Sequence, residues 1–106
     1  MPGPDLSREI ERTLEDLERR VQAAADAGST AGLPDLDFES VPGRLDIECP
    51  DGARLILSRQ SATNQIWLAE PGGGWHFDLR DGRWLCDKRG TELTAVLDAL
   101  LAEHAR

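Results

Sequence analysis

Apolar residues recur at helical intervals near the start of the chain. Between Leu6 and about Ala25 they stand three or four positions apart, which puts them on one stripe of a helix: Leu6, Ile10, Leu14, Leu17 and Val21. Asp5 or Ser7 can cap the start of this helix. Two glycines and a proline in the stretch 28–34 predict a loop after it. We therefore expect the first element to be a one-sided helix.

Short segments in which apolar and polar residues alternate follow this loop. Turn sequences separate these segments: Pro42-Gly43, Asp51-Gly52, Gly72-Gly73-Gly74 and Asp81-Gly82. The alternation predicts about six strands, at residues 35–40, 44–49, 53–59, 65–69, 75–79 and 83–86. Because the connections are tight, consecutive strands should pair antiparallel.

A second one-sided helix follows the strands. Thr91 is placed to cap it, and its apolar stripe consists of Leu93, Val96, Leu97, Leu100 and Leu101. Two one-sided helices can cover only one face of a sheet, and a chain of 106 residues has room for one domain. We therefore expect a single α+β domain over residues 1–106. It should be a two-layer sandwich, with two helices packed on one face of an antiparallel sheet of about six strands.

The charge of the chain narrows the classes of partner. Lys and Arg number 12 and Asp and Glu number 20, giving a net charge of −8, and 12 of the acids lie in residues 1–48. Such a field disfavours nucleic acid and anionic membranes, and favours cations or a basic protein surface. The N-terminus lacks the pattern of a signal peptide, and no apolar run approaches the roughly 18 residues of a membrane span. We expect a cytoplasmic monomer in which Cys49 and Cys86 are reduced and buried.

One candidate site is the sheet face that the helices leave open. If Ile66 and Leu68 point to the core, Gln65 and Trp67 point outward as an exposed indole beside an amide. Tryptophan is over-represented among the residues that contribute most to protein interfaces. The pattern predicts a protein-binding surface made of Ser58, Gln60, Gln65, Trp67 and His76. A partly covered sheet aromatic without a partner is the alternative for Trp67.

Carboxylates form a second candidate site. Three of them share a strip of the first helix and three alternate along the first strand, so two neighbouring rows are expected: Glu11, Glu15 and Glu18, and Asp35, Asp37 and Glu39. Oxygen ligands suit hard cations, and an open row gives weak, exchangeable coordination. The alternative is a solvated face of ion pairs, because Arg19 and Arg20 follow Glu15 and Asp16 by four residues.

Spaced motifs in the middle of the chain resemble a known family. They are Arg59-Gln60, Gln65-Ile66-Trp67-Leu68-Ala69, Gly73-Gly74-Trp75-His76-Phe77-Asp78, Trp84 and Cys86-Asp87. This block is similar to the centre of the bacterial frataxins, the CyaY family. The resemblance implies both helices on one sheet face and iron on an acidic ridge made by the first helix and first strand. It also implies that the ridge and open sheet face contact the cysteine desulfurase and scaffold protein of iron–sulfur cluster assembly.

The chain departs from this family pattern at two points. Arg19, Arg20 and a run of alanines occupy the end of the first helix, where the bacterial relatives are dense in Asp and Glu, and Ser58 stands where Asn is usual. We nevertheless expect an iron-binding regulator of iron–sulfur cluster assembly. Ferrous or ferric iron would be held weakly by Glu11, Glu15, Glu18, Asp35, Asp37 and Glu39.

Two other functions remain open from the sequence. One is an iron carrier or ferroxidase-type iron donor, and the other is a protein-interaction module without a metal function. The chain has no Gly-x-Ser-x-Gly motif and no helical His pair, and its glycine run lacks the Gly-Lys-Ser/Thr of a phosphate loop. A ferroxidase would have to use the open carboxylates, without a buried ligand cage. We therefore predict a protein that is not an enzyme.

Overall fold

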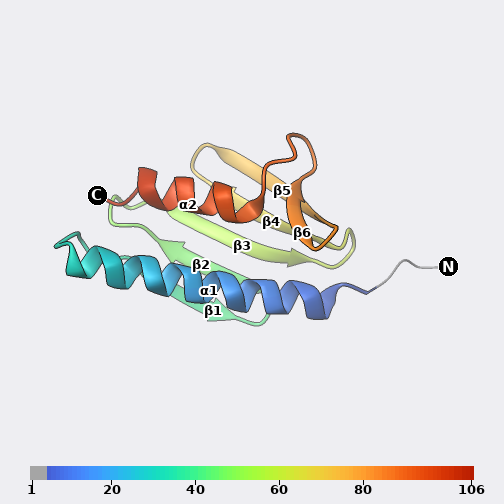
Figure 1. Cartoon of the computed structure of the whole chain (residues 1–106), viewed down its shortest axis with the longest axis horizontal. Coiled ribbons are helices and arrows are strands. Elements are labelled where there is room, and N and C mark those ends of the chain that lie inside the picture. Colours follow the sequence, from blue (N-terminus) through green and yellow to red (C-terminus); the bar gives the residue numbers. More distant parts are fainter. Residues whose placement is uncertain (1–4) are drawn as a thin grey trace.

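The computed structural model describes residues 5–106. The first residues of the N-terminus, which lack the pattern of a signal peptide, lie outside the described residues. Residues 5–106 form two helices and six strands, in the order α1 (Ser7–Thr30), β1 (Asp37–Val41), β2 (Arg44–Glu48), β3 (Arg54–Gln60), β4 (Gln65–Glu70), β5 (Gly73–Arg80), β6 (Arg83–Cys86) and α2 (Leu93–Glu103). The strands pair antiparallel in sequence order. Both helices lie on one face of this sheet (Figure 1). The predicted α+β sandwich is confirmed.

Alternation along the strands sends one set of side chains toward the helices. The buried cluster combines this set with the apolar stripes of both helices: Ile10, Leu14, Leu17, Val21, Leu45, Ile47, Cys49, Leu55, Leu57, Ile66, Leu68, Phe77, Trp84, Cys86, Leu93, Val96, Leu97 and Leu100. The predicted burial of both cysteines is confirmed, and burial raises the pKa of the Cys49 thiol to about 11. Trp84 also belongs to the core, and its indole N–H donates to Thr13 Oγ1 at 2.8 Å.

Helix α1 is longer than the sequence predicted. The turn residues of 28–34 indicated a loop, but the helix continues to Thr30. Gln22 donates to the Asp26 carboxylate at 2.9 Å, and the Thr30 hydroxyl donates to the Asp26 carbonyl at 3.0 Å. The preceding alanines have the highest helix propensity, which offsets the cost of a single glycine. The chain leaves the helix only near Gly32, whose φ is +77°.

The predicted caps are met only in part. Leu6 holds the N-cap position of α1, but the carboxylate of Asp5 accepts the Ser7 N–H at 2.9 Å, and hydrogen bonding from Ser7 lowers the pKa of Asp5. The prediction that Thr91 caps the second helix is wrong, because Glu92 holds that position. The carbonyl of Thr91 instead accepts the Cys86 N–H at 2.8 Å, so Thr91 extends the pairing of β6.

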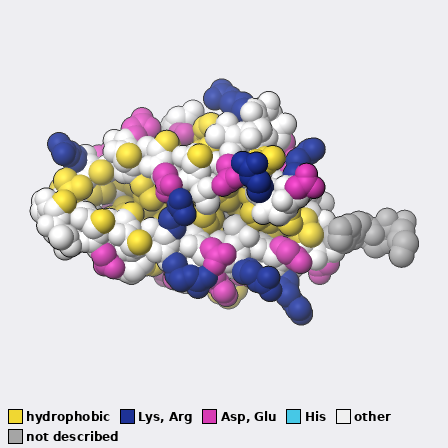
Figure 2. Space-filling model, viewed as in Figure 1, with side chains coloured by type: hydrophobic (Ala, Val, Ile, Leu, Met, Phe, Trp, Pro, Cys, Tyr) yellow, Lys and Arg dark blue, Asp and Glu magenta, His cyan; other side chains and the backbone are white. Residues whose placement is uncertain are grey.

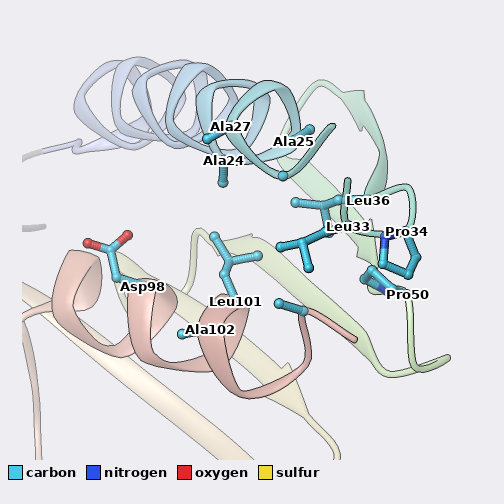
Figure 3. A pocket seen from close by; sticks show the side chains of 12 residues that line it. Ala24, Ala25, Ala27, Leu33, Pro34, Leu36, Pro50, Asp98, Leu101 and Ala102 are labelled. Atoms are coloured by element: carbon cyan, nitrogen blue, oxygen red, sulfur yellow. The ribbon is translucent and has the colours of Figure 1, made fainter. Parts of the chain in front are cut away.

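The two helices are joined by an ion pair above an apolar hollow. Nε and Nη2 of Arg20 each donate to an Asp98 oxygen at 2.8 Å, which raises the pKa of Arg20 and lowers that of Asp98. Hydrophobic side chains gather between the helices near their C-terminal ends (Figure 2), around a hollow of about 350 Å³. Leu33, Leu36 and Leu101 converge in this hollow (Figure 3).

No helix within residues 5–106 is long and apolar enough to cross a membrane.

Candidate functional site

The strand register lines up three predicted binding residues on the open face of the sheet. Trp67 on β4 lies between Ser58 on β3 and His76 on β5. The rings of Trp67 and His76 are stacked, with centroids 4.2 Å apart and planes 15° apart. This contact leaves Trp67 half-buried, so the expectation of an exposed indole is wrong in degree. The outward positions predicted for Trp67 and His76 are confirmed.

Hydrogen bonds fix the orientation of the indole. Trp67 Nε1 donates to Gln65 Oε1 at 2.9 Å, while Gln65 Nε2 donates to Asp78 Oδ1 at 3.0 Å and to Asp87 Oδ2 at 3.4 Å. The same Asp87 oxygen lies 3.7 Å from His76 Nδ1, and the Asp87 N–H donates to the His76 carbonyl at 2.9 Å. We call these five residues the tryptophan cluster. Their contacts close a ring that holds Trp67 in place without a partner.

Ser58 and Gln60 border the tryptophan cluster on β3. Ser58 is the cross-strand neighbour of Trp67 and Gln60 that of Gln65, and Gln60 Nε2 donates to Ser58 Oγ at 3.1 Å. All five residues predicted for partner binding therefore lie on one continuous surface. Sequence reasoning missed Asp78 and Asp87. Asp78 directly follows the buried Phe77, so the alternation along the strand could have placed it on the open face. The position of Asp87 depends on the path of the loop after β6, which the sequence pattern does not predict.

The six predicted metal-ligating carboxylates, which we call the acidic edge, fall into two groups. The three on α1 line a hollow of about 240 Å³ beside the turn between β1 and β2: Glu11, Glu15 and Glu18. Glu11 Oε1 accepts from Arg59 Nη1 at 2.9 Å, and Glu18 Oε1 accepts from Ser40 Oγ at 2.7 Å. Val41 borders the same hollow and is 52% exposed. This group therefore combines carboxylates with an exposed apolar side chain.

The three carboxylates around β1 lie apart from those on α1. Asp37 and Glu39 are the cross-strand neighbours of Glu48 and Asp46, and these four residues line a separate hollow. Asp35 is exposed and precedes β1, so its predicted place within the strand is wrong. The two carboxylate rows are therefore not the neighbours that the sequence predicted. Ser40 faces α1 and contacts Glu18, whereas Asp37 and Glu39 face the opposite side of β1. Within residues 5–106, no three Asp, Glu, His or Cys side chains gather as metal ligands.

Basic side chains compensate part of this acidity, though in different pairs from those expected. Arg19 pairs with Asp16, and Arg20 with Asp98 on α2, so neither forms the predicted i,i+4 pair. On the open sheet face, Arg44 Nε lies 2.7 Å from Asp46 Oδ1. Such exposed pairs contribute little stability, and none of these three includes a carboxylate of the acidic edge.

Comparison with known proteins identifies the class of this fold. A model of the frataxin-like domain matches residues 4–106, and the chain belongs to the frataxin family. The iron–sulfur cluster assembly protein CyaY of Thioalkalivibrio sulfidiphilus is 43% identical over 104 residues, with 96% of this chain and 92% of the relative covered. The CyaY protein of Vibrio cholerae is 34% identical over 97 residues, with 92% and 89% covered.

Solved structures agree with this family. The frataxin of Psychromonas ingrahamii superposes with a TM-score of 0.73 at 25% identity, over 92% of this chain and 89% of that one. A trimeric frataxin from Saccharomyces cerevisiae, complexed with ferrous iron, gives a TM-score of 0.68 at 26% identity, over 99% and 89%. Because the yeast protein is trimeric, the monomeric state expected for this chain stays a prediction.

Proposed function

We propose that this protein regulates iron–sulfur cluster assembly by docking on the cysteine desulfurase and its scaffold protein. The docking surface consists of the tryptophan cluster with Ser58 and Gln60. One observation carries this proposal: Trp67 is held by Gln65 and His76 on the sheet face opposite to the two helices of residues 5–106. A side chain that is already ordered loses little conformational entropy on binding, which favours it as an anchor. The CyaY relatives are named for the same process.

The acidic edge would complement a basic surface of the desulfurase. The excess of carboxylates in residues 1–48 gives that side of the chain a negative field. Opposite charge on the partner would speed encounter and make binding dependent on salt. Val41 would add an apolar contact beside Glu15 and Glu18, since it is exposed at the rim of the same hollow.

Iron would bind to the acidic edge weakly and exchangeably, as a cargo or modulator. Oxygen-only coordination suits ferrous and ferric ions, and open carboxylates hold such ions without a cage. The separation of the two carboxylate groups favours two weak patches over one shared centre. Iron at either patch would reduce the negative charge near the docking surface and so change affinity for a basic partner.

The test is the initial rate of cluster formation on the cognate scaffold with its cysteine desulfurase, with and without this protein, across a range of ferrous iron. The wild-type protein should change the rate, and Trp67→Ala should remove most of that change. Replacing Asp35, Asp37 and Glu39 by alanine should alter its dependence on iron while docking is retained. Thermal melting of each variant shows whether the fold is intact.

Two results would refute this proposal. A rate that the wild-type protein leaves unchanged at every iron concentration would exclude regulation of assembly. If Trp67→Ala acts like wild type while the carboxylate variant is inactive, iron delivery is the primary function. In that case the acidic edge would replace the tryptophan cluster as the functional site.

A further inference from the structure

A second aromatic residue lies on the other side of the sheet, beside a pair of basic residues. Trp75 pairs with the core residue Leu68 on β4, so it faces the helix side, opposite to Trp67 and His76. The guanidinium carbon of Arg89 lies 5.4 Å from the centroid of the Trp75 ring. Lys88 and Arg89, both exposed, border a hollow of about 270 Å³ with Trp75, Glu70 and the glycines of 72–74. We call Trp75, Lys88 and Arg89 the basic–aromatic patch.

The ring of Trp75 is held as a rigid platform. It stacks on Phe77 with centroids 6.3 Å apart and planes 8° apart. Its Nε1 donates to Glu70 Oε2 at 3.2 Å, and the other Glu70 oxygen accepts the Gly72 N–H. A guanidinium over an aromatic face keeps its N–H donors free at its edge, where they can bind a carboxylate. The platform therefore presents Arg89 in a position to receive an anion.

The two positive charges of this patch are only partly neutralised locally. In the described part of the chain, neither Lys88 nor Arg89 forms an ion pair. Glu70 lines the same hollow and keeps its negative charge while it accepts from the Trp75 indole and from the Gly72 N–H. Asp87 instead contacts Gln65 and His76 on the opposite face. The lining of the hollow thus carries two positive charges and one negative charge, which leaves a local excess of one positive charge in a chain of net charge −8.

We propose that the basic–aromatic patch binds a short acidic peptide segment of a partner protein. Arg89 would pair with one carboxylate through its N–H edge, and Lys88 would attract a second. The glycines of 72–74 carry no side chains, so an extended backbone can approach the hollow. The inference does not depend on the proposed function, because the patch and the tryptophan cluster lie on opposite faces.

The short screening length of electrostatic interactions in salt solution favours a peptide ligand over nucleic acid. At an ionic strength of about 0.1 M, charges are screened beyond roughly 10 Å. A short peptide on the patch therefore senses mainly Lys88, Arg89 and Glu70, whose charges sum to +1. A long polyanion such as nucleic acid would extend over the rest of the surface and be repelled by the net charge of −8.

Fluorescence anisotropy of fluorescein-labelled hexaglutamate, titrated with the full chain at about 0.1 M ionic strength, tests this proposal. We expect saturable binding that the double variant Lys88→Ala/Arg89→Ala weakens about five- to tenfold, the size expected from two exposed charge pairs. The matched control is Arg8→Ala/Arg12→Ala, which removes the same charge from α1 and should bind within about twofold of wild type. Arg89→Lys should bind more weakly than wild type, because it keeps the charge but loses the planar donor edge.

Three outcomes would overturn the proposal. The first is no anisotropy change with the wild-type chain. The second is an equal loss in the patch variant and the control, which would show that only net charge matters. The third is tighter binding of a six-nucleotide single-stranded DNA than of hexaglutamate, which would make the patch a phosphate site. Thermal melting of the two double variants excludes unfolding as the cause of a loss.

Discussion

The tryptophan cluster and the acidic edge are built from polar side chains in two different ways. In the tryptophan cluster, adjacent strands carry Gln65, Trp67, His76 and Asp78, and the sheet register sets their spacing. In the acidic edge, the carboxylates come from helix α1, from the edge strand β1 and, for Asp35, from the segment before that strand. Their spacing depends on how α1 lies against that strand and on which side of β1 each residue faces. The first surface is interlocked, whereas the second is dispersed.

This difference indicates which function each surface can perform. Interlocked side chains present one shape to a partner, which suits specific recognition at low entropic cost. Dispersed and hydrated carboxylates exert a field but do not define a coordination geometry, which suits steering and weak cation binding. Within one small domain, recognition and charge can therefore be changed separately by mutation.

Truncation of Trp67 should have the largest effect on docking. We expect Trp67→Ala to weaken binding to the desulfurase–scaffold complex at least tenfold, roughly the lower range for a central aromatic anchor. Isothermal titration calorimetry at fixed salt measures the loss. The free energy of unfolding should change less than for truncation of the buried neighbour Phe77, which would cost about 3–5 kcal/mol.

Ile56 provides the control for that measurement. It is a half-buried apolar residue on the same face, but it pairs with Ala69 and lies outside the tryptophan cluster. Ile56→Ala should keep the affinity within about twofold, as most interface-rim truncations do. If both variants lose affinity equally, the whole face contributes to binding and Trp67 is not its anchor.

Loss of the Gln65 side chain should have a smaller effect through the orientation of Trp67. Gln65→Leu removes the acceptor of the indole N–H and the donor to Asp78 and Asp87. We expect an affinity loss of about 1 kcal/mol, the net contribution of one such hydrogen bond. The indole N–H resonance of Trp67 should shift in the free protein, before any partner is added. Gln60→Leu, which disturbs only a contact to Ser58, should leave that resonance in place.

Iron titration can test whether the acidic edge is one site or two. Because Glu15 and Glu18 lie on the helix side of β1 while Asp37 and Glu39 lie on the other, losses from the two groups should add. We expect the double variants Glu15→Gln/Glu18→Gln and Asp37→Asn/Glu39→Gln each to weaken ferrous iron binding by about two- to fivefold, as for weak carboxylate contacts in water. Anaerobic calorimetry of both pairs and their combination measures this additivity. A combined loss no greater than either single loss would indicate one shared site.

Most of the fold could be predicted from the sequence because its pattern is local. The stripe from Ile10 to Val21 and the alternation around Ile66 and Leu68 each report which side of an element is buried. That information was sufficient to predict that two helices cover one face of the sheet. The end of α1 was misplaced because Gly28 resembles a turn residue, and only the helical contacts of Asp26 and Thr30 show that the helix continues.

The sites were less predictable because they depend on contacts between distant segments. Alternation sent Trp67 outward, but no sequence pattern indicates that His76 covers one face of its ring. Asp87 reaches the tryptophan cluster only through the path of the loop after β6. Likewise, no local pattern separates Glu18 from Glu39, because that depends on how α1 packs against the edge strand.

The smallest expected effect concerns a contact outside both surfaces. His104 Nδ1 lies 2.6 Å from Asp51 Oδ2, which ties the end of α2 to the turn between β2 and β3. This hydrogen bond raises the pKa of His104 above its usual 6.5 and lowers the pKa of Asp51, while Glu103 and Glu70 add to the effect on His104. The folded state therefore binds the His104 proton more tightly than the unfolded state does.

The sign of the pH dependence follows from this preference. The stabilisation is complete below pH 6.5, as long as Asp51 remains ionised, and is lost as pH rises through the raised pKa of His104. The melting temperature of the wild type should thus fall over that range, whereas the melting temperature of His104→Gln should fall less. Docking should be equal for the two proteins, since neither surface includes His104. Parallel melting profiles would show that the contact contributes no stability in solution, and unequal docking would show that the end of α2 influences the tryptophan cluster.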